Sequence, residues 1–156
     1  MECAMTPVMS HDNEILERKV ERHFHLILAC RRIGERNADG YTQALLGWVA
    51  TSHELMLTAT LKVLGQRGGR APRYADLMRA AVRLEIAVPV LDDSALSGTS
   101  RTLEDLVRFC ERLLARSDVA VDVIGLVKAD LEELREELAN LERVRLEATA
   151  RARAAA

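Results

Sequence analysis

The strongest constraint on the fold is a run of regularly spaced apolar residues in the last quarter of the chain. Its members are separated by alternating intervals of four and three residues: Ala120, Ile124, Val127, Leu131, Leu134, Leu138, Leu141, Arg145 and Ala148. This heptad spacing is typical of a helix that packs along a seam against other helices. The sequence therefore predicts a C-terminal helix about 45 Å long, at ~1.5 Å per residue.

The two ends of this helix are less sharply defined than its middle. Valine alternates with other residues over 119–123, as in a strand, and Gly125 costs a helix roughly 1 kcal/mol. The helix is therefore expected to begin either at the start of this segment or only at Leu126. Near the other end Arg145 occupies a seam position, where an arginine needs to reach solvent or a carboxylate such as Glu142.

Two helices are predicted in the first part of the chain. Ser10 is a suitable N-cap for the first, which ends before the turn-forming residues 37–40. Asp39 or Thr42 caps the second, and the glycines within 65–69 end it. The inward stripe expected for the second helix is Leu45, Trp48 with Val49, Ser52, Leu55 with Met56, Ala59 and Val63.

The middle of the chain is predicted to hold two further helices. Pro72 fits the first turn of a short third helix. The apolar run 86–91 contains a proline, so we expect an extended segment there, followed by a polar loop over 92–100. Thr99 or Ser100 then caps a fourth helix.

Composition supports one soluble helical domain. Of 156 residues, 49% are hydrophobic but only 3% aromatic, so the core is expected to consist of aliphatic seams. No apolar run approaches the ~18 residues that a membrane span needs. The predicted fold is all-α, a bundle of about four helices plus the long heptad-bearing helix. Its expected organisation is a flexible tail (1–9), a helical core (10–116), the long helix of the same domain (117–150) and a frayed tail (151–156).

The predicted compartment is the cytoplasm. The N-terminal residues lack the basic and apolar regions of a secretory signal. The three cysteines cannot all pair with one another, which favours reduced thiols.

No cofactor is expected, because the chain has no glycine-rich nucleotide motif and no Glu-x-x-His or His-Glu-x-x-His metal motif. His23 and His25 are about 200° apart on a helix, so the pair cannot chelate one ion. A metal site built across helices from His23, Cys30 and His53 is the alternative, and ordinary buried histidines are preferred over it.

Three arginines form the first candidate for an anion or nucleic-acid site. Arg67, Arg70 and Arg73 follow a glycine-rich helix end and precede the start of the next helix. Free amide groups at a helix start and nearby arginines can together bind a phosphate or an acidic partner. The alternative is a solvated connection between helices.

A second candidate lies in the first helix. The segment from Arg18 to His25 contains arginine followed by histidine at two spacings, Arg18 to His23 and Arg18 to His25. It resembles the Arg-x(4 to 6)-His motif of HEPN-domain ribonucleases, and residues 54–65 resemble a helix segment of some of those domains. The resemblance implies a small helical dimer in which His25 acts as a base and Arg18 holds phosphate. The motif comes earlier in this chain than is usual in that family.

The function predicted from these patterns is non-enzymatic. We expect a helical interaction or assembly protein, homo-oligomeric, that associates through helix seams with a protein partner or with itself. The predicted interaction seam consists of Ile124, Val127, Leu131, Leu134, Leu138 and Leu141. A helical RNA-associated protein or a HEPN-like ribonuclease is the alternative, less favoured because the net charge is only -2.

Overall fold

The computed structural model describes residues 10–36, 39–87 and 95–156, which form five helices and no strand. The helices are α1 (His11–Arg36), α2 (Gly40–Gln66), α3 (Tyr74–Ala87), α4 (Ala95–Leu114) and α5 (Val121–Ala154). The predicted all-α bundle with a long C-terminal helix is confirmed. No described helix is both long enough and apolar enough to span a membrane.

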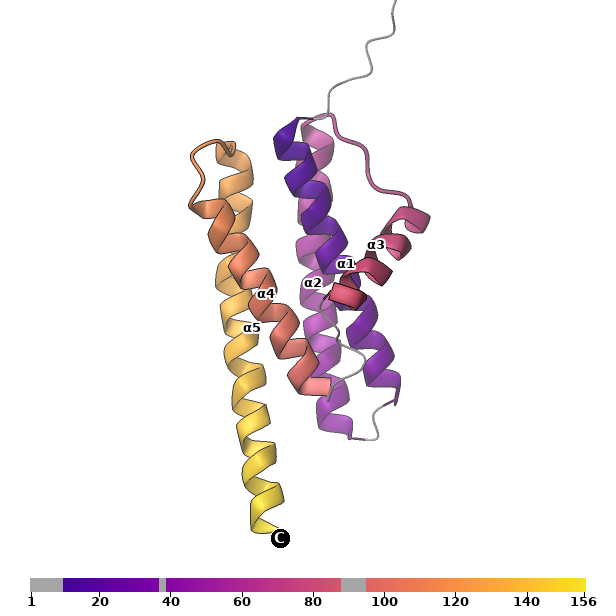
Figure 1. Cartoon of the computed structure of the whole chain (residues 1–156), viewed down its shortest axis with the longest axis vertical. Coiled ribbons are helices and arrows are strands. Elements are labelled where there is room, and N and C mark those ends of the chain that lie inside the picture. The colour runs from indigo at the N-terminus through magenta and orange to yellow at the C-terminus, as the bar shows by residue number, and fades with distance from the viewer. Residues whose placement is uncertain (1–9, 37–38, 88–94) are drawn as a thin grey trace, which may run out of the picture.

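The bundle consists of two helical hairpins (Figure 1). The first hairpin is formed by α1 and α2, and the second by α4 and α5. The short α3 packs on the outside of α1, where the rings of Phe24 and Tyr74 meet edge to face at 6.0 Å and His25 Nε2 lies 2.8 Å from Glu85 Oε2. The main core lies between the two hairpins, and its apolar members come from α1, α2, α4 and α5.

The predicted caps of the first two helices are confirmed, but α2 continues through Gly65 to Gln66 instead of stopping at Gly65. The Ser10 hydroxyl accepts a hydrogen bond from the Asn13 backbone N–H at 3.2 Å, and the Asp39 carboxylate accepts from the N–H groups of Tyr41 and Thr42. At the end of α2, Gly68 has a φ of 75°, a left-handed conformation that favours glycine.

The predictions for the third and fourth helices need correction. Pro72 precedes α3 and does not lie in its first turn, since the helix begins at Tyr74. Residues 95–100 belong to α4, so Thr99 and Ser100 are buried helical residues and cannot be its caps. The polar composition suggested a loop, but a hydroxyl side chain can also be accommodated inside a helix, as Thr102 is by donating to the Gly98 carbonyl at 3.0 Å. The remainder of the predicted extended segment and loop lies outside the described residues.

The long helix α5 begins at Val121, so the alternative start at Leu126 is wrong. It continues to Ala154, into the predicted frayed tail, and its C-terminal end extends past the other helices (Figure 1). Arg145 lies on the solvent side and pairs with Glu142 at 3.3 Å, as predicted.

Gly125 provides a first test of the helix assignment. A Cβ added at Gly125 meets no atom within 4 Å, so Gly125→Ala is expected to stabilise the protein by about 1 kcal/mol through helix propensity alone. Gly69→Ala is the matched contrast, because its Cβ would collide with the Leu64 side chain. Urea denaturation of both variants measures the difference, and a destabilised Gly125→Ala would contradict the assignment of 121–126 to α5.

The helix α2 is rotated relative to its predicted orientation. Its buried side chains are Thr42, Leu46, Val49, Ala50, His53, Met56, Thr60 and Leu64. Trp48 and Leu55, predicted to face inward, are 38% and 70% exposed, and Tyr41 is 53% exposed. Only two of the 27 residues of α2 are charged, Glu54 and Lys62, so apolar residues surround the helix and their spacing does not define one inward face.

Candidate functional site

Six polar side chains meet in the middle of the bundle, where apolar packing would be expected. We call them the buried cluster: Lys19 and His23 from α1, His53 and Thr60 from α2, and Asp130 and Glu137 from α5. Five of the six are 0% exposed, and Asp130 is 5% exposed. Lysine and glutamate are almost never fully buried unless they are paired, so this cluster is the most unusual chemical feature of the core.

The cluster forms a continuous chain of contacts. The Lys19 ammonium is ion-paired with Asp130, donates to Thr60 Oγ1 at 2.9 Å and lies 3.0 Å from His23 Nε2. On the other side of that ring, His23 Nδ1 lies 2.7 Å from His53 Nδ1. His53 Nε2 then lies 2.8 Å from Glu137 Oε2, so the chain begins and ends on α5.

The proton positions along this chain follow from the chemistry of its ends. An ammonium group only donates, so His23 Nε2 must accept and His23 must carry its proton on Nδ1. His23 Nδ1 then donates to His53 Nδ1, which leaves the His53 proton on Nε2, where it is donated to the Glu137 carboxylate. Both imidazoles are neutral in this arrangement.

Burial sets the electrostatics of the cluster. It lowers the pKa of His23 well below the usual value, and the nearby Lys19 and His53 lower that pKa further. Burial also raises the pKa of Asp130, although the Lys19 ammonium opposes this effect. With one ammonium and two carboxylates, the cluster carries one net negative charge when its imidazoles are neutral.

The Lys19 ammonium lies between the Asp130 carboxylate and the His23 imidazole. Its contacts with Asp130, His23 and Thr60 supply the oxygen and nitrogen partners that a cation requires. Within the described residues, no group of three histidine, cysteine, aspartate or glutamate side chains converges in a way that would hold a metal ion. The lysine is the positive charge that the structure places among these side chains.

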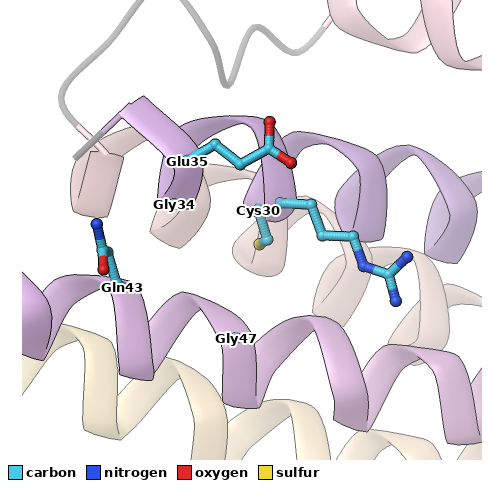
Figure 2. Close-up of a pocket in the computed structure, with 6 residues that line it drawn as sticks. Cys30, Gly34, Glu35, Gln43 and Gly47 are labelled. Atoms are coloured by element: carbon cyan, nitrogen blue, oxygen red, sulfur yellow. The ribbon is translucent and has the colours of Figure 1, made fainter.

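A hollow of about 340 Å³ lies on the surface between α1 and α2. It is lined by Cys30, Arg31, Gly34, Glu35, Gln43 and Gly47, and Figure 2 shows the Cys30 side chain directed toward α2. Burial raises the pKa of the Cys30 thiol to about 12, so it remains protonated and is a poor nucleophile. The hollow therefore lacks a reactive group at Cys30.

The arginines of the predicted anion site have different roles. Arg67 joins the two hairpins, because its guanidinium lies 2.9 Å from Asp12 Oδ2 and 3.0 Å from both carboxylate oxygens of Asp122. Arg70 and Arg73 are exposed, and within the described part of the chain neither forms an ion pair.

The residues of the ribonuclease-like motif are also separated by the fold. His23 is part of the buried cluster, whereas Arg18 is exposed on the outside of α1. His25 lies under α3, where it pairs with Glu85, and is 5% exposed.

The predicted interaction seam of α5 lies mainly inside the chain. Val127, Leu131, Leu134 and Leu141 are at most 4% exposed, and Ile124 and Leu138 are half-buried against the same core. The helices of the same chain therefore cover this seam.

A different helical face is left uncovered. We call it the outer face of α2, and its members are Tyr41, Ala44, Trp48, Thr51, Leu55, Thr58 and Lys62. All seven side chains are exposed, and they follow one another at alternating intervals of three and four residues. This is the heptad spacing of a seam between helices, on a surface with a single charge at one end.

Sequence reasoning missed Lys19, Asp130 and Glu137 completely. The signal that was available is their spacing: Asp130 and Glu137 are seven residues apart, and Lys19 is four residues before His23. Each of these acidic residues precedes a leucine, Leu131 or Leu138, that fits the predicted apolar seam. Asp130 and Glu137 were therefore expected to lie beside the seam and not within it.

Comparison with known proteins adds no further assignment, since no family model, no curated protein and no solved structure matches the chain.

Proposed function

We propose that the protein is a helical assembly protein that associates with a second copy of itself through the outer face of α2. The observation that carries this proposal is the exposed heptad seam with Trp48 and Leu55 on a helix that has only two charged residues. A helix with so few charges is commonly buried on more than one side, and here the chain itself leaves this face exposed. Trp48 and Leu55, at the centre of the face, are typical anchors for an apolar contact.

Chemical matching favours an antiparallel pair of α2 helices. If the two-fold axis passes near Thr51, Trp48 faces Leu55 of the other copy and Ala44 faces Thr58, so large side chains oppose large ones and small oppose small. Tyr41, which already contacts Arg143 of α5 in its own chain, then lies opposite Lys62 at the edge of the pair. A parallel pair would instead bring the two Lys62 side chains together.

Trp48 provides the direct test, because it is the only tryptophan in the chain. We expect its fluorescence emission to shift to shorter wavelength with rising protein concentration, in step with a doubling of mass measured by light scattering. Trp48→Ala is expected to raise the dimer dissociation constant by about 30-fold, the equivalent of ~2 kcal/mol for a central anchor.

Ile86→Lys is the matched control, because Ile86 is 78% exposed on α3, away from the outer face of α2. It should leave the dissociation constant unchanged. A protein that is monomeric at every concentration, or a dimer that Trp48→Ala leaves intact, would refute the proposal.

The orientation can be tested separately by cross-linking in a Cys3→Ser background. In the antiparallel pair, the two copies of residue 44 are about 21 Å apart, at ~1.5 Å per residue. Ala44→Cys alone should therefore fail to form a disulfide-linked dimer. A mixture of Ala44→Cys and Thr58→Cys proteins should form one, and the reverse result would indicate a parallel pair.

A further inference from the structure

Polar contacts join the two hairpins alongside the apolar core that lies between them. Within each hairpin the helices pack closely, whereas fewer contacts link α1 to α4 and α2 to α5. The contacts between hairpins include Lys19 with Asp130, His53 with Glu137, and the half-buried pair of Arg22 with Asp105 at 2.7 Å. The buried cluster is therefore in a position to control whether the hairpins stay together.

The Nδ1 to Nδ1 contact makes this cluster sensitive to added protons. At 2.7 Å there is room for one proton between the two nitrogens, which His23 supplies and His53 accepts. A second proton on His53 Nδ1 would place two N–H donors face to face. A second proton on His23 would fall on Nε2, which faces the Lys19 ammonium at 3.0 Å. Neither imidazole can become charged without breaking this series of hydrogen-bonded contacts.

We propose that the buried cluster is a proton switch, which holds the two hairpins together while both imidazoles are neutral and separates them when an imidazole becomes charged. Under acidic conditions the first proton goes to a carboxylate of the cluster. It neutralises the net negative charge and leaves the Nδ1 to Nδ1 contact intact. A later proton that goes to either imidazole breaks that contact. The hairpins therefore separate only when the pH falls below a threshold.

The other titratable groups that face the cluster do not interfere in this range. From α4, the Cys110 thiol lies near Lys19 and Asp130, and burial raises its pKa to about 11. From α1, the Cys30 thiol lies near Glu137 and stays protonated, as described above. Among the described residues, the groups that can change charge at acidic pH are thus His23, His53, Asp130 and Glu137.

The direction of the pH effect follows from proton binding in the two states. Unfolded histidine binds a proton near pH ~6.5, whereas His23 in the folded protein does not, so acidification favours unfolding through this group. The raised pKa of Asp130 acts in the opposite direction, because the folded state takes up that proton first. His23 alone therefore contributes up to about tenfold in the unfolding constant per pH unit below the pKa of unfolded histidine.

The first experiment measures urea denaturation between pH 7.5 and 5. The unfolding constant of the unmodified protein is expected to rise by about tenfold per pH unit below pH ~6.5. In the double variant His23→Gln and His53→Gln, the rise should disappear or reverse, since the cluster then keeps its carboxylates but has no imidazole. His25→Gln is the matched control, because its histidine contacts Glu85 on α3 and not the cluster, and it should keep the rise.

The second experiment uses the unmodified side chains, so it does not depend on how the double variant folds. Nitrogen NMR of the imidazoles at pH 7.5 should show the Nδ1–H form for His23 and the Nε2–H form for His53. Either imidazole found charged while the hairpins remain packed, or the opposite proton positions, would overturn the proposal.

The third experiment separates hairpin opening from complete unfolding. Spin labels at Arg18→Cys and Lys128→Cys report on the distance between the hairpins, and labels at Arg108→Cys and Lys128→Cys report on the second hairpin alone. All three positions are exposed. In a Cys3→Ser background, acidification should lengthen only the first distance. If both distances change together, or neither changes, the cluster is not a switch between hairpins.

Discussion

Replacing Lys19 with methionine is expected to destabilise the fold by about 3–5 kcal/mol, the range for removing one partner of a buried ion pair. The substitution keeps much of the side-chain volume but leaves the carboxylates of Asp130 and Glu137 in the core without a positive charge. It also removes the donors to Thr60 Oγ1 and His23 Nε2. Urea denaturation at pH 7 measures the loss.

The double variant Lys19→Met with Asp130→Leu is the informative control. Replacing a buried ion pair by apolar side chains of similar size is often neutral or stabilising, so this variant should recover most of the loss. A Lys19→Met protein as stable as the parent would contradict the buried ion pair. If the double variant is no more stable than the single one, Asp130 is not the main partner of the ammonium.

Shortening Leu134 to alanine is expected to destabilise the protein by 2–5 kcal/mol, roughly the cost of removing a large apolar side chain from a close-packed core. Leu134 is 0% exposed at the middle of α5, between the positions of Asp130 and Glu137. The cavity left behind lies next to the buried cluster, where the neighbouring polar groups are tied by hydrogen bonds and cannot move in to fill it. Thermal or urea denaturation measures the effect.

Two leucines of the same helix are matched controls for this substitution. Leu138→Ala should have a smaller effect, because Leu138 is only half-buried. Leu146→Ala should change the stability by less than ~0.5 kcal/mol, since Leu146 is 66% exposed near the end of α5. Equal losses at 134 and 138 would support the seam expected from the sequence over the one found in the structure.

The number and approximate extent of the helices were predictable because local signals determine them. Ser10 and Asp39 cap α1 and α2 through their own side chains, and Gly68 ends α2 through a conformation that other residues avoid. The start of α4 was not predictable in the same way. Its first turns are rich in small polar residues, which are typical of loops when the neighbouring helices are unknown.

The orientation of two helices could not be read from their sequences. In α2 apolar residues occur on every side, so Trp48 and Leu55 fit an inward stripe as well as Val49 and Met56 do. In α5 the leucine heptads predicted one seam, whereas the buried residues are Val123, Val127, Asp130, Leu131, Leu134, Glu137, Leu141 and Val144. The predicted seam and the buried face share residues 127, 131, 134 and 141, but the buried face also includes Asp130 and Glu137 and leaves Leu138 only half-buried.

The sequence alone therefore determined an all-α chain whose apolar spacing predicts five helices, the last of them long and bearing heptads. It contains no recognisable motif for a metal or a nucleotide. Only the tertiary structure placed carboxylates in the core of α5, a lysine opposite them and a tryptophan on the surface. The physical reason is that a buried charge is stable only when a partner lies opposite it. Lys19 is 111 residues from Asp130, so the energy that decides the position of each exists only in the folded chain.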